Sequence, residues 1–257
     1  MRVTILGCGG ASGVPGISMG WGACDPANPR NRRRRSSILV EEGDRRILVD
    51  TSPDLRDQLL DAGVAKVDGV IYTHDHADHL HGIDDLREIN RATRQWLPVW
   101  GAPAVLDTAR TRFPYAFEPM ETMGEFIYRP LLEAKEIHGP FSIAGIDIVP
   151  FDQDHGYSRT LGLRFGSIAY STDVVEIPEE SFAVLAGVEL WIIGCLVDHP
   201  HATHAHVDKA LEWISRVKPR RAVLTHMGPR LDYETLCARL PSGVVAAYDG
   251  LILECSQ

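Results

Sequence analysis

The chain has 257 residues, is 44% hydrophobic and 24% charged, and carries 26 Lys and Arg against 35 Asp and Glu, a formal net charge of −9. This composition excludes a disordered chain, and the acidic surplus argues against broad coating of nucleic acid or adhesion to anionic membranes. The five cysteines are widely spaced, which argues against a secreted disulfide framework.

The amino-terminal sequence MRVTILGCGG predicts a short strand that runs into glycines, and it lacks the long apolar stretch of a signal peptide. No stretch of the sequence approaches the ~18 consecutive apolar residues expected of a membrane span. We therefore expect a cytoplasmic protein that does not engage a membrane.

Short runs rich in Val, Ile and Leu and bounded by Gly, Asp or Pro predict β-strands along most of the chain. These runs cover residues 3–6, 37–40, 46–49, 69–72, 147–150, 161–165, 168–170, 190–193, 222–224, 244–247 and 251–253. Amphipathic stretches between some of the strands predict helices. They cover residues 53–62, 104–112, 207–217 and 232–240.

The order of these elements predicts an α/β fold with layered sheets. No linker rich in Pro, Gly or Ser divides the sequence, so we expect a single domain over residues 1–257. The segment 118–139 fits no clear periodicity, and we interpret it as an insertion near the functional site.

Arg30 and the run from Arg32 to Arg35 form a dense block of positive charge ahead of the strand predicted at residues 37–40. The simpler interpretation is a solvated loop before that strand. The alternative is a local positive rim that attracts a phosphate group in an otherwise acidic protein.

Three of the 11 histidines lie in one short motif. The strand predicted at residues 69–72 runs directly into Thr73-His74-Asp75-His76-Ala77-Asp78-His79, an H-x-H-x-D-H pattern. Where a strand gives way to a tight loop, alternate side chains can converge instead of pointing to opposite faces. Imidazoles and a carboxylate form the set of N and O ligands that Zn²⁺, Fe²⁺ and Mn²⁺ prefer. The motif therefore predicts a metal site without thiolate ligands.

This motif, placed after a strand, resembles the signature of the metallo-β-lactamase superfamily, and the similarity covers nearly the whole chain. Three later landmarks follow in the expected order: His155 in a loop after a strand, Asp173 at the end of a strand, and His226 at the end of a late strand. Members of this family fold as a four-layer αββα sandwich. The resemblance implies that fold here, with a dinuclear metal site at one edge of the two sheets.

The resemblance also implies the ligands of two divalent metal ions per chain. One ion is held by His74, His76 and His155, the other by Asp78, His79 and His226, with Asp173 and a water or hydroxide bridging them. The ligand set suits Zn²⁺ or Mn²⁺, with Fe²⁺ as a further alternative. Asp78 also matches the general-base position and is a catalytic candidate. Asp75 falls on the intervening position, where hydrogen bonding to a ligand or simple solvation is expected.

The glycine run after the first predicted strand, Gly7-Cys8-Gly9-Gly10-Ala11-Ser12-Gly13-Val14-Pro15, is similar to one branch of the superfamily. That branch contains the cyclic phosphodiesterase of bacterial phosphonate breakdown. Its members often carry several cysteines after the glycine run that form a structural zinc site. Only Cys24 stands in the matching stretch, so we expect no structural zinc.

A second marker of the branch is the sequence Pro200-His201-Ala202-Thr203-His204. His204 matches an active-site histidine thought to assist the leaving group or contact the phosphate, and its ordinary pKa suits acid–base work. We interpret His199, His201 and His206 as solvated loop and helix-cap residues. Tyr157 and Arg159, just after His155, are candidates for substrate binding, although packing or solvation would explain them equally well.

We therefore expect a metal-dependent hydrolase, a phosphodiesterase that cleaves a small cyclic or nucleotide-like phosphodiester with a metal-bridging hydroxide. A thioester or lactone hydrolase of the same fold is one alternative, and a non-catalytic nucleotide- or metal-binding protein is another. A tRNA 3′-processing nuclease is disfavoured by the net charge of −9 and by the lack of a basic arm. If the chain self-associates, a homodimer is the expected form.

Overall fold

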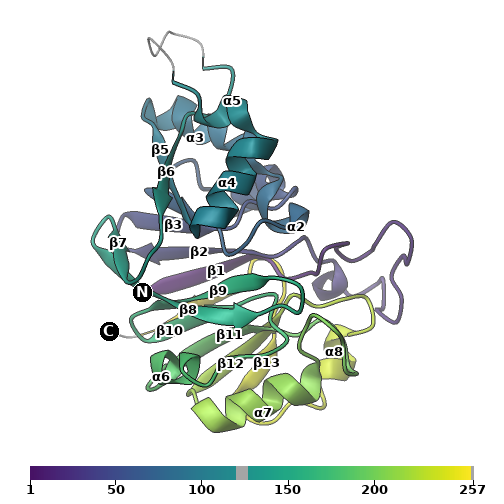
Figure 1. The fold of residues 1–257 in the computed structure, drawn as a ribbon. Helices are drawn as coiled ribbons and strands as arrows, with labels where there is room; N and C mark the ends of the chain where they lie inside the picture. Colours follow the sequence, from purple (N-terminus) through teal and green to yellow (C-terminus); the bar gives the residue numbers. More distant parts are fainter. Residues whose placement is uncertain (120–126, 256–257) are drawn as a thin grey trace.

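Two seven-stranded β-sheets pack face to face in this computed structural model, which describes residues 1–119 and 127–255 (Figure 1). The first sheet contains, from edge to edge, β14 (Ile252–Glu254), β1 (Arg2–Gly7), β2 (Ser37–Glu42), β3 (Arg45–Val49), β4 (Gly69–Ile71), β5 (Leu97–Gly101) and β6 (Leu132–Glu136). The strands from β14 to β3 pair antiparallel, and those from β3 to β6 pair parallel. Val49 pairs with Ile71, so β3 and β4 end side by side at one edge of the sheet.

The second sheet has the same number of strands in the described residues. From edge to edge they are β13 (Val244–Ala246), β12 (Arg221–Thr225), β11 (Leu190–Gly194), β10 (Ile168–Ser171), β9 (Arg159–Phe165), β8 (Ile146–Asp154) and β7 (Phe141–Ile143). The strands from β10 to β13 are parallel, and β7 to β10 are antiparallel. Because β10, β11 and β12 run in one direction, the loops that leave their carboxyl ends share one edge.

Helices cover the outer faces of both sheets. On the first sheet they are α1 (Leu55–Ala62), α2 (Ala77–Leu80), α3 (Leu86–Thr93), α4 (Pro103–Arg112) and α5 (Pro114–Phe117), and on the second α6 (Ser181–Leu185), α7 (Val207–Val217) and α8 (Tyr233–Cys237). Short 3-10 turns add η1 (Pro29–Asn31) and η2 (Ile83–Asp85). This arrangement confirms the predicted α/β class and the four-layer αββα sandwich. Among the described residues, no helix has the length and apolar character needed to cross a bilayer.

Two apolar cores explain why many strands are apolar at successive positions. Ile5 and Ile38 point into a core between the sheets that also contains Leu163 and Phe165 of the second sheet. Their neighbours in sequence, such as Leu39, point to the other face, into a core under the helices of the first sheet. Successive side chains of a strand alternate between faces, so a strand buried on both faces is apolar throughout.

Each predicted strand overlaps an observed strand, and each predicted helix overlaps an observed helix. Three strands were not predicted: β5 contains Pro98, β6 carries charged residues, and β7 is only three residues long. The described part of the segment 118–139 includes β6, so that part belongs to the first sheet and is not an insertion. Residues 120–126 of this segment lie outside the described residues.

Candidate metal centre

The H-x-H-x-D-H motif begins where β4 ends and turns into a helix within the motif. His74 follows the end of β4 by three positions and is buried. The backbone is still extended at His76, with φ −65° and ψ 150°, and α2 starts directly after it. The helix turns Asp78 and His79 inward, where both are buried, and leaves His76 exposed. The local change from strand to helix therefore brings four ligand-type side chains of one short segment to one side.

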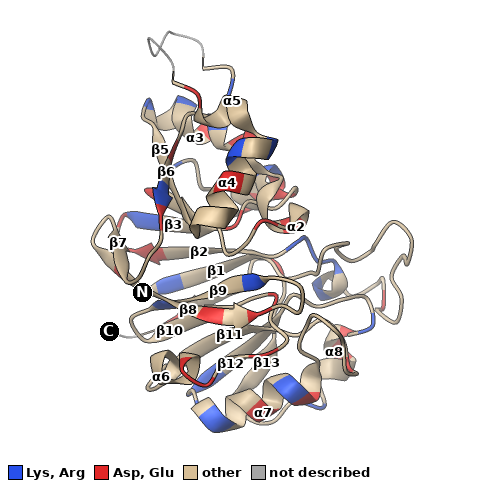
Figure 2. Ribbon diagram, in the orientation of Figure 1, with Lys and Arg blue, Asp and Glu red and all other residues tan. Residues whose placement is uncertain are grey.

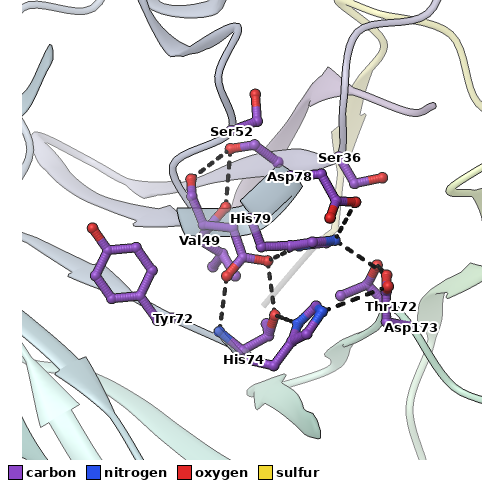
Figure 3. A network of polar contacts seen from close by, with 12 residues as sticks. Ser36, Val49, Ser52, Tyr72, His74, Asp78, His79, Thr172 and Asp173 are labelled. Atoms are coloured by element: carbon purple, nitrogen blue, oxygen red, sulfur yellow. Dashed lines mark hydrogen bonds and ion pairs between the residues drawn. The ribbon is translucent and has the colours of Figure 1, made fainter. Parts of the chain in front are cut away.

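Side chains from both sheets complete two groups that share Asp173. The groups are His74, His76, His155 and Asp173, and Asp78, His79, Asp173 and His226, and within each the candidate ligand atoms lie within 4.8 Å of one another. These are the seven residues expected from the sequence, brought together from the ends of β4, β8, β10 and β12. Figure 3 shows His74, Asp78 and His79 converging on Asp173.

The Asp173 carboxylate divides its two oxygens between the groups. Oδ2 lies 3.6 Å from Nε2 of His74 and 3.5 Å from Nε2 of His155. Oδ1 lies 3.2 Å from Nε2 of His79 and 2.9 Å from Nε2 of His226. One carboxylate thus faces both groups, which is the geometry a bridging ligand requires.

Hydrogen bonds behind three of the histidines orient their rings. Nδ1 of His79 lies 2.7 Å from Oδ2 of Asp50, and Nδ1 of His155 lies 2.6 Å from the carbonyl oxygen of Thr203. Nδ1 of His74 lies 3.0 Å from Oγ1 of Thr73. Each contact occupies Nδ1 and turns Nε2 into the site, as the outer contacts of metal-ligating histidines do.

Buried polar atoms without partners test whether the residues fit a metal ion. Nε2 of His74, His79 and His226 and Oδ2 of Asp78 have no hydrogen-bond partner among the described residues. Leaving a buried polar atom unpaired is costly, and native proteins rarely do so. Atoms of this kind, placed in two groups around Asp173, fit bound cations.

The electrostatics of the site also favour a cation. Burial would raise the pKa of Asp173, but His226 and His79 hold it well below its usual range. Burial would likewise lower the pKa of His226, yet the adjacent Asp173 raises it to about 9. The buried carboxylates therefore draw positive charge into the site, and a divalent ion would supply it. His155 is different, because burial lowers its pKa to about 4 and leaves it neutral, as a ligand must be.

Backbone strain is concentrated at this edge. Asp50, Asp173 and His226 have φ values of 63°, 46° and 55°, in the left-handed region that residues other than glycine rarely adopt. Such conformations cost on the order of 1–3 kcal/mol each and cluster at functional sites. Here each of these residues follows a strand and contributes a side chain to the two groups or, for Asp50, to a histidine of one group.

Sequence analysis did not single out Asp50, which is fully buried and central to the site. Its carboxylate accepts hydrogen bonds from the backbone N–H and the hydroxyl of Thr73, both at 2.8 Å, besides contacting His79. Asp50 directly follows a predicted strand, and that position was the available signal.

His204 lies in the site, whereas Tyr157 and Arg159 are exposed. Nε2 of His204 is 3.3 Å from Oδ2 of Asp173, and its ring stacks on that of His226 at 5.1 Å. The Tyr157 side chain is 93% exposed. Arg159 is exposed and lies 3.6 Å from Asp152. Substrate binding by Tyr157 and Arg159 stays a prediction without a contact to support it.

The arginine block is a partly solvated loop, in which Arg30 and Arg32 are exposed and Arg33 is the buried exception. Arg34 and Arg35 form ion pairs with Asp61 and Asp54, at 2.7 and 3.0 Å. Arg30 lies over the rings of Tyr233 and Tyr248, and Arg32 over that of Trp21. Arg33 is buried. Acidic residues thus pair with Arg34 and Arg35, and aromatic rings lie beside Arg30 and Arg32. Basic and acidic residues are interspersed over the molecule (Figure 2).

A family model described as a beta-lactamase superfamily domain matches residues 45–227. Octanoyltransferase from Porphyromonas gingivalis (strain ATCC BAA-308 / W83) is 32% identical over 256 residues, which cover 98% of this chain and 51% of that protein. Ribonuclease Z from Bradyrhizobium sp. (strain ORS 278) is 36% identical over 95 residues, 35% of this chain and 31% of the nuclease. The chain thus spans about half the length of the first of these relatives and under a third of the second.

A solved structure is similar over its full length. The crystal structure of a diphosphatase from the PhnP family has a TM-score of 0.90 to this chain at 32% sequence identity, and the match covers 99% of this chain and 98% of that one.

Proposed function

Because the chain belongs to the metallo-β-lactamase superfamily of metal-dependent hydrolases, we propose that it is a dinuclear phosphodiesterase for a small cyclic or nucleotide-like substrate. One observation carries the proposal: Asp173 presents one carboxylate oxygen to each of two histidine-rich groups. The ligands to one ion would be His74, His76 and His155, those to the other Asp78, His79 and His226, and Asp173 would serve both. All are N and O donors, which suits Zn²⁺ or Mn²⁺, with Fe²⁺ as an alternative.

When bound, two divalent ions stabilise charge that develops on a phosphoryl group and lower the pKa of water at the site. The protein's part is to hold the donors in place and to move protons. Oδ2 of Asp78 lies 3.3 Å from Nε2 of His79 but has no hydrogen-bond partner among the described residues, so it can bind an ion or accept a proton. His204 faces the same space from the second sheet, and we assign it contact with the phosphate or the leaving-group oxygen. Its Nδ1 lies 2.8 Å from Oγ1 of Thr203, which directs Nε2 toward Asp173.

Two similarities support a phosphorus ester over other substrates. The structure that matches over its full length is named a diphosphatase, and one relative is named a ribonuclease. The test is metal analysis of the purified protein together with turnover of aryl phosphodiesters, cyclic nucleotides, nucleoside diphosphate esters and a precursor tRNA under each metal. We expect about two ions per chain and turnover of a small phosphodiester. A protein that binds no divalent metal, or that hydrolyses none of these compounds, would contradict the proposal.

One observation favours a second candidate, a hydrolase of acyl thioesters. The relative that matches 98% of this chain is named an octanoyltransferase, although this chain spans only 51% of it. The name could describe either part of that longer protein. An octanoyl thioester in the same substrate panel separates the two: thioester turnover that exceeds phosphodiester turnover would favour this second function.

A further inference from the structure

Arg33 is buried, with 2% of its surface exposed, in the middle of an arginine-rich segment. Its hydrogen-bond partners in the described chain are all uncharged. They are the carbonyl oxygens of Gly228 and Leu231, Oδ1 of Asn31 and Sγ of Cys24, at 3.2, 2.6, 3.2 and 3.9 Å. Burying a charge without a counter-ion is costly, and hydrogen bonds offset only part of that cost. Such a cost favours a role beyond filling space.

The partners of Arg33 lie in the loop that follows His226. The guanidinium reaches Gly228 and Leu231 across 195 and 198 positions of sequence. The backbone of Arg33 meanwhile pairs with Val14, through hydrogen bonds of 2.9 and 2.8 Å, and so anchors the turn after the glycine run. One residue thus joins the amino-terminal loop to the loop after β12.

Asn31 strengthens the same connection. Its Oδ1 accepts hydrogen bonds from Arg33 and from the backbone N–H of Tyr233, the latter at 2.8 Å. Its Nδ2 donates to Asp232 at 2.7 Å, and Asp232 caps α8 through the N–H of Thr235. The loop after His226 is therefore held at both its start and its end by residues 31 and 33.

His226 is oriented differently from the other buried histidines of the site. His74, His79 and His155 each have a contact on Nδ1, whereas neither ring nitrogen of His226 has a hydrogen-bond partner in the described residues. Its backbone is strained, with φ 55°. Nε2 faces Oδ1 of Asp173 at 2.9 Å, and no contact on Nδ1 holds the ring from behind, so its direction depends more on how the backbone around residue 226 is fixed.

Backbone and side-chain hydrogen bonds fix that region. The N–H of Met227 donates to the carbonyl of Cys8 at 2.7 Å, and the N–H of Gly228 donates to the carbonyl of Leu196 at 2.9 Å. The guanidinium of Arg33 adds a side-chain contact to the carbonyl of Gly228, which substitution can remove.

We propose that Arg33 is a positioning residue that sets His226 for metal binding by holding the backbone of the loop after it. This inference rests on the proposed function, because it assumes that His226 ligates an ion. The planar guanidinium offers donors in two directions and can satisfy Gly228, Leu231 and Asn31 together, which a single ammonium on a flexible stem cannot do. Arg33→Lys keeps the charge and removes that geometry.

The test compares metal binding in the whole protein for wild type, Arg33→Lys and a matched control, Arg129→Lys. Arg129 is also buried, at 7% exposure, and donates to the backbone carbonyls of Tyr115, Glu118 and Pro119, far from His226 in the fold. Each metal-free protein is titrated with Zn²⁺, and the visible spectrum of its Co²⁺ form is recorded. For Arg33→Lys we expect one of two ions to bind about 10- to 100-fold more weakly and the Co²⁺ spectrum to change.

Arg129→Lys is expected to lower the melting temperature while both ions bind as in wild type. If Arg33→Lys also keeps two tight ions and an unchanged spectrum, Arg33 supports only folding and the inference is wrong. Should Arg33→Lys fail to fold, Asn31→Ser removes one acceptor of the guanidinium, and we expect weaker binding of the same ion; unchanged binding would overturn the inference. Wild-type protein that does not bind two ions would instead refute the proposed function on which the inference rests.

Discussion

Oδ2 of Asp50, which follows β3, lies 2.7 Å from Nδ1 of His79 in α2, and the two side chains are fully buried. The carboxylate fixes the ring's orientation and places the proton on Nδ1, so that Nε2 is free to bind an ion. The same carboxylate binds Thr73, whose hydroxyl contacts His74. Asp50 therefore orients His79 of one group directly and His74 of the other group through Thr73.

Asp50→Asn is expected to weaken metal binding by about 10- to 100-fold, because an amide can present its NH₂ to the ring and favour the wrong tautomer. Zn²⁺ titration of the metal-free variant measures the change. Asp61→Asn is a suitable control, since it removes only a partly exposed ion pair with Arg34. Equal affinities in wild type and Asp50→Asn would show that the contact does not tune the site.

Asp173→Asn is expected to lower the affinity for both ions, since this carboxylate faces both groups, whereas His76→Ala should affect only one. Asn tolerates the left-handed backbone at position 173, so the fold should be kept. Metal content per chain after dialysis is the measurement. The shared role of Asp173 is contradicted if the Asn variant retains one ion as tightly as wild type.

His204→Ala is expected to reduce kcat on a phosphodiester by about 10²- to 10⁴-fold, as for loss of a group that transfers a proton. Metal content should stay unchanged, because His204 belongs to neither proposed ligand set. His199→Ala provides the control from the same loop, since His199 is exposed and contacts Asp198. Comparable losses in the two variants would argue against a specific role for His204.

Stability should depend on pH through Asp249. Burial raises the pKa of its carboxyl to about 6, although the N–H groups of Arg34 and Cys8 oppose the shift. The folded state then binds this proton more tightly than the unfolded chain, whose ordinary value is near 3.9. The contribution of Asp249 is therefore greatest at about pH 4, falls as the pH rises to about 6, and is then constant.

Comparison with Asp249→Asn isolates this group, because the amide does not titrate. With a chelator present, the stability advantage of wild type over the variant should shrink by up to about 3 kcal/mol between pH 4 and pH 7. Thermal unfolding of both proteins across this range is the measurement. Parallel stability curves, or an advantage that grows with pH, would refute the assignment.

The layers of the fold could be predicted from the sequence, and the members of the two groups from its resemblance to the metallo-β-lactamase superfamily. Strands buried on both faces are continuous apolar runs, and His74, Asp173 and His226 each follow such a run. These signals are local, since they depend on neighbours within a few positions. These local signals fail for β5 and β6, because β5 contains Pro98 and β6 carries charged residues. Only the pairing with neighbouring strands shows that these segments are strands.

Tertiary structure brings those residues together. That Asp173 faces two groups, as the resemblance implied, depends on strand ends from different sheets meeting at one edge. The role of Asp50 follows from the parallel pairing of β3 with β4, which brings it to Thr73 and His79. Arg33 resembles its exposed neighbours in sequence, yet it is buried because carbonyl groups nearly 200 positions away accept its hydrogen bonds. Local sequence determines the type of element and its ends, whereas partners distant in sequence determine which charges are buried and what they hold in place.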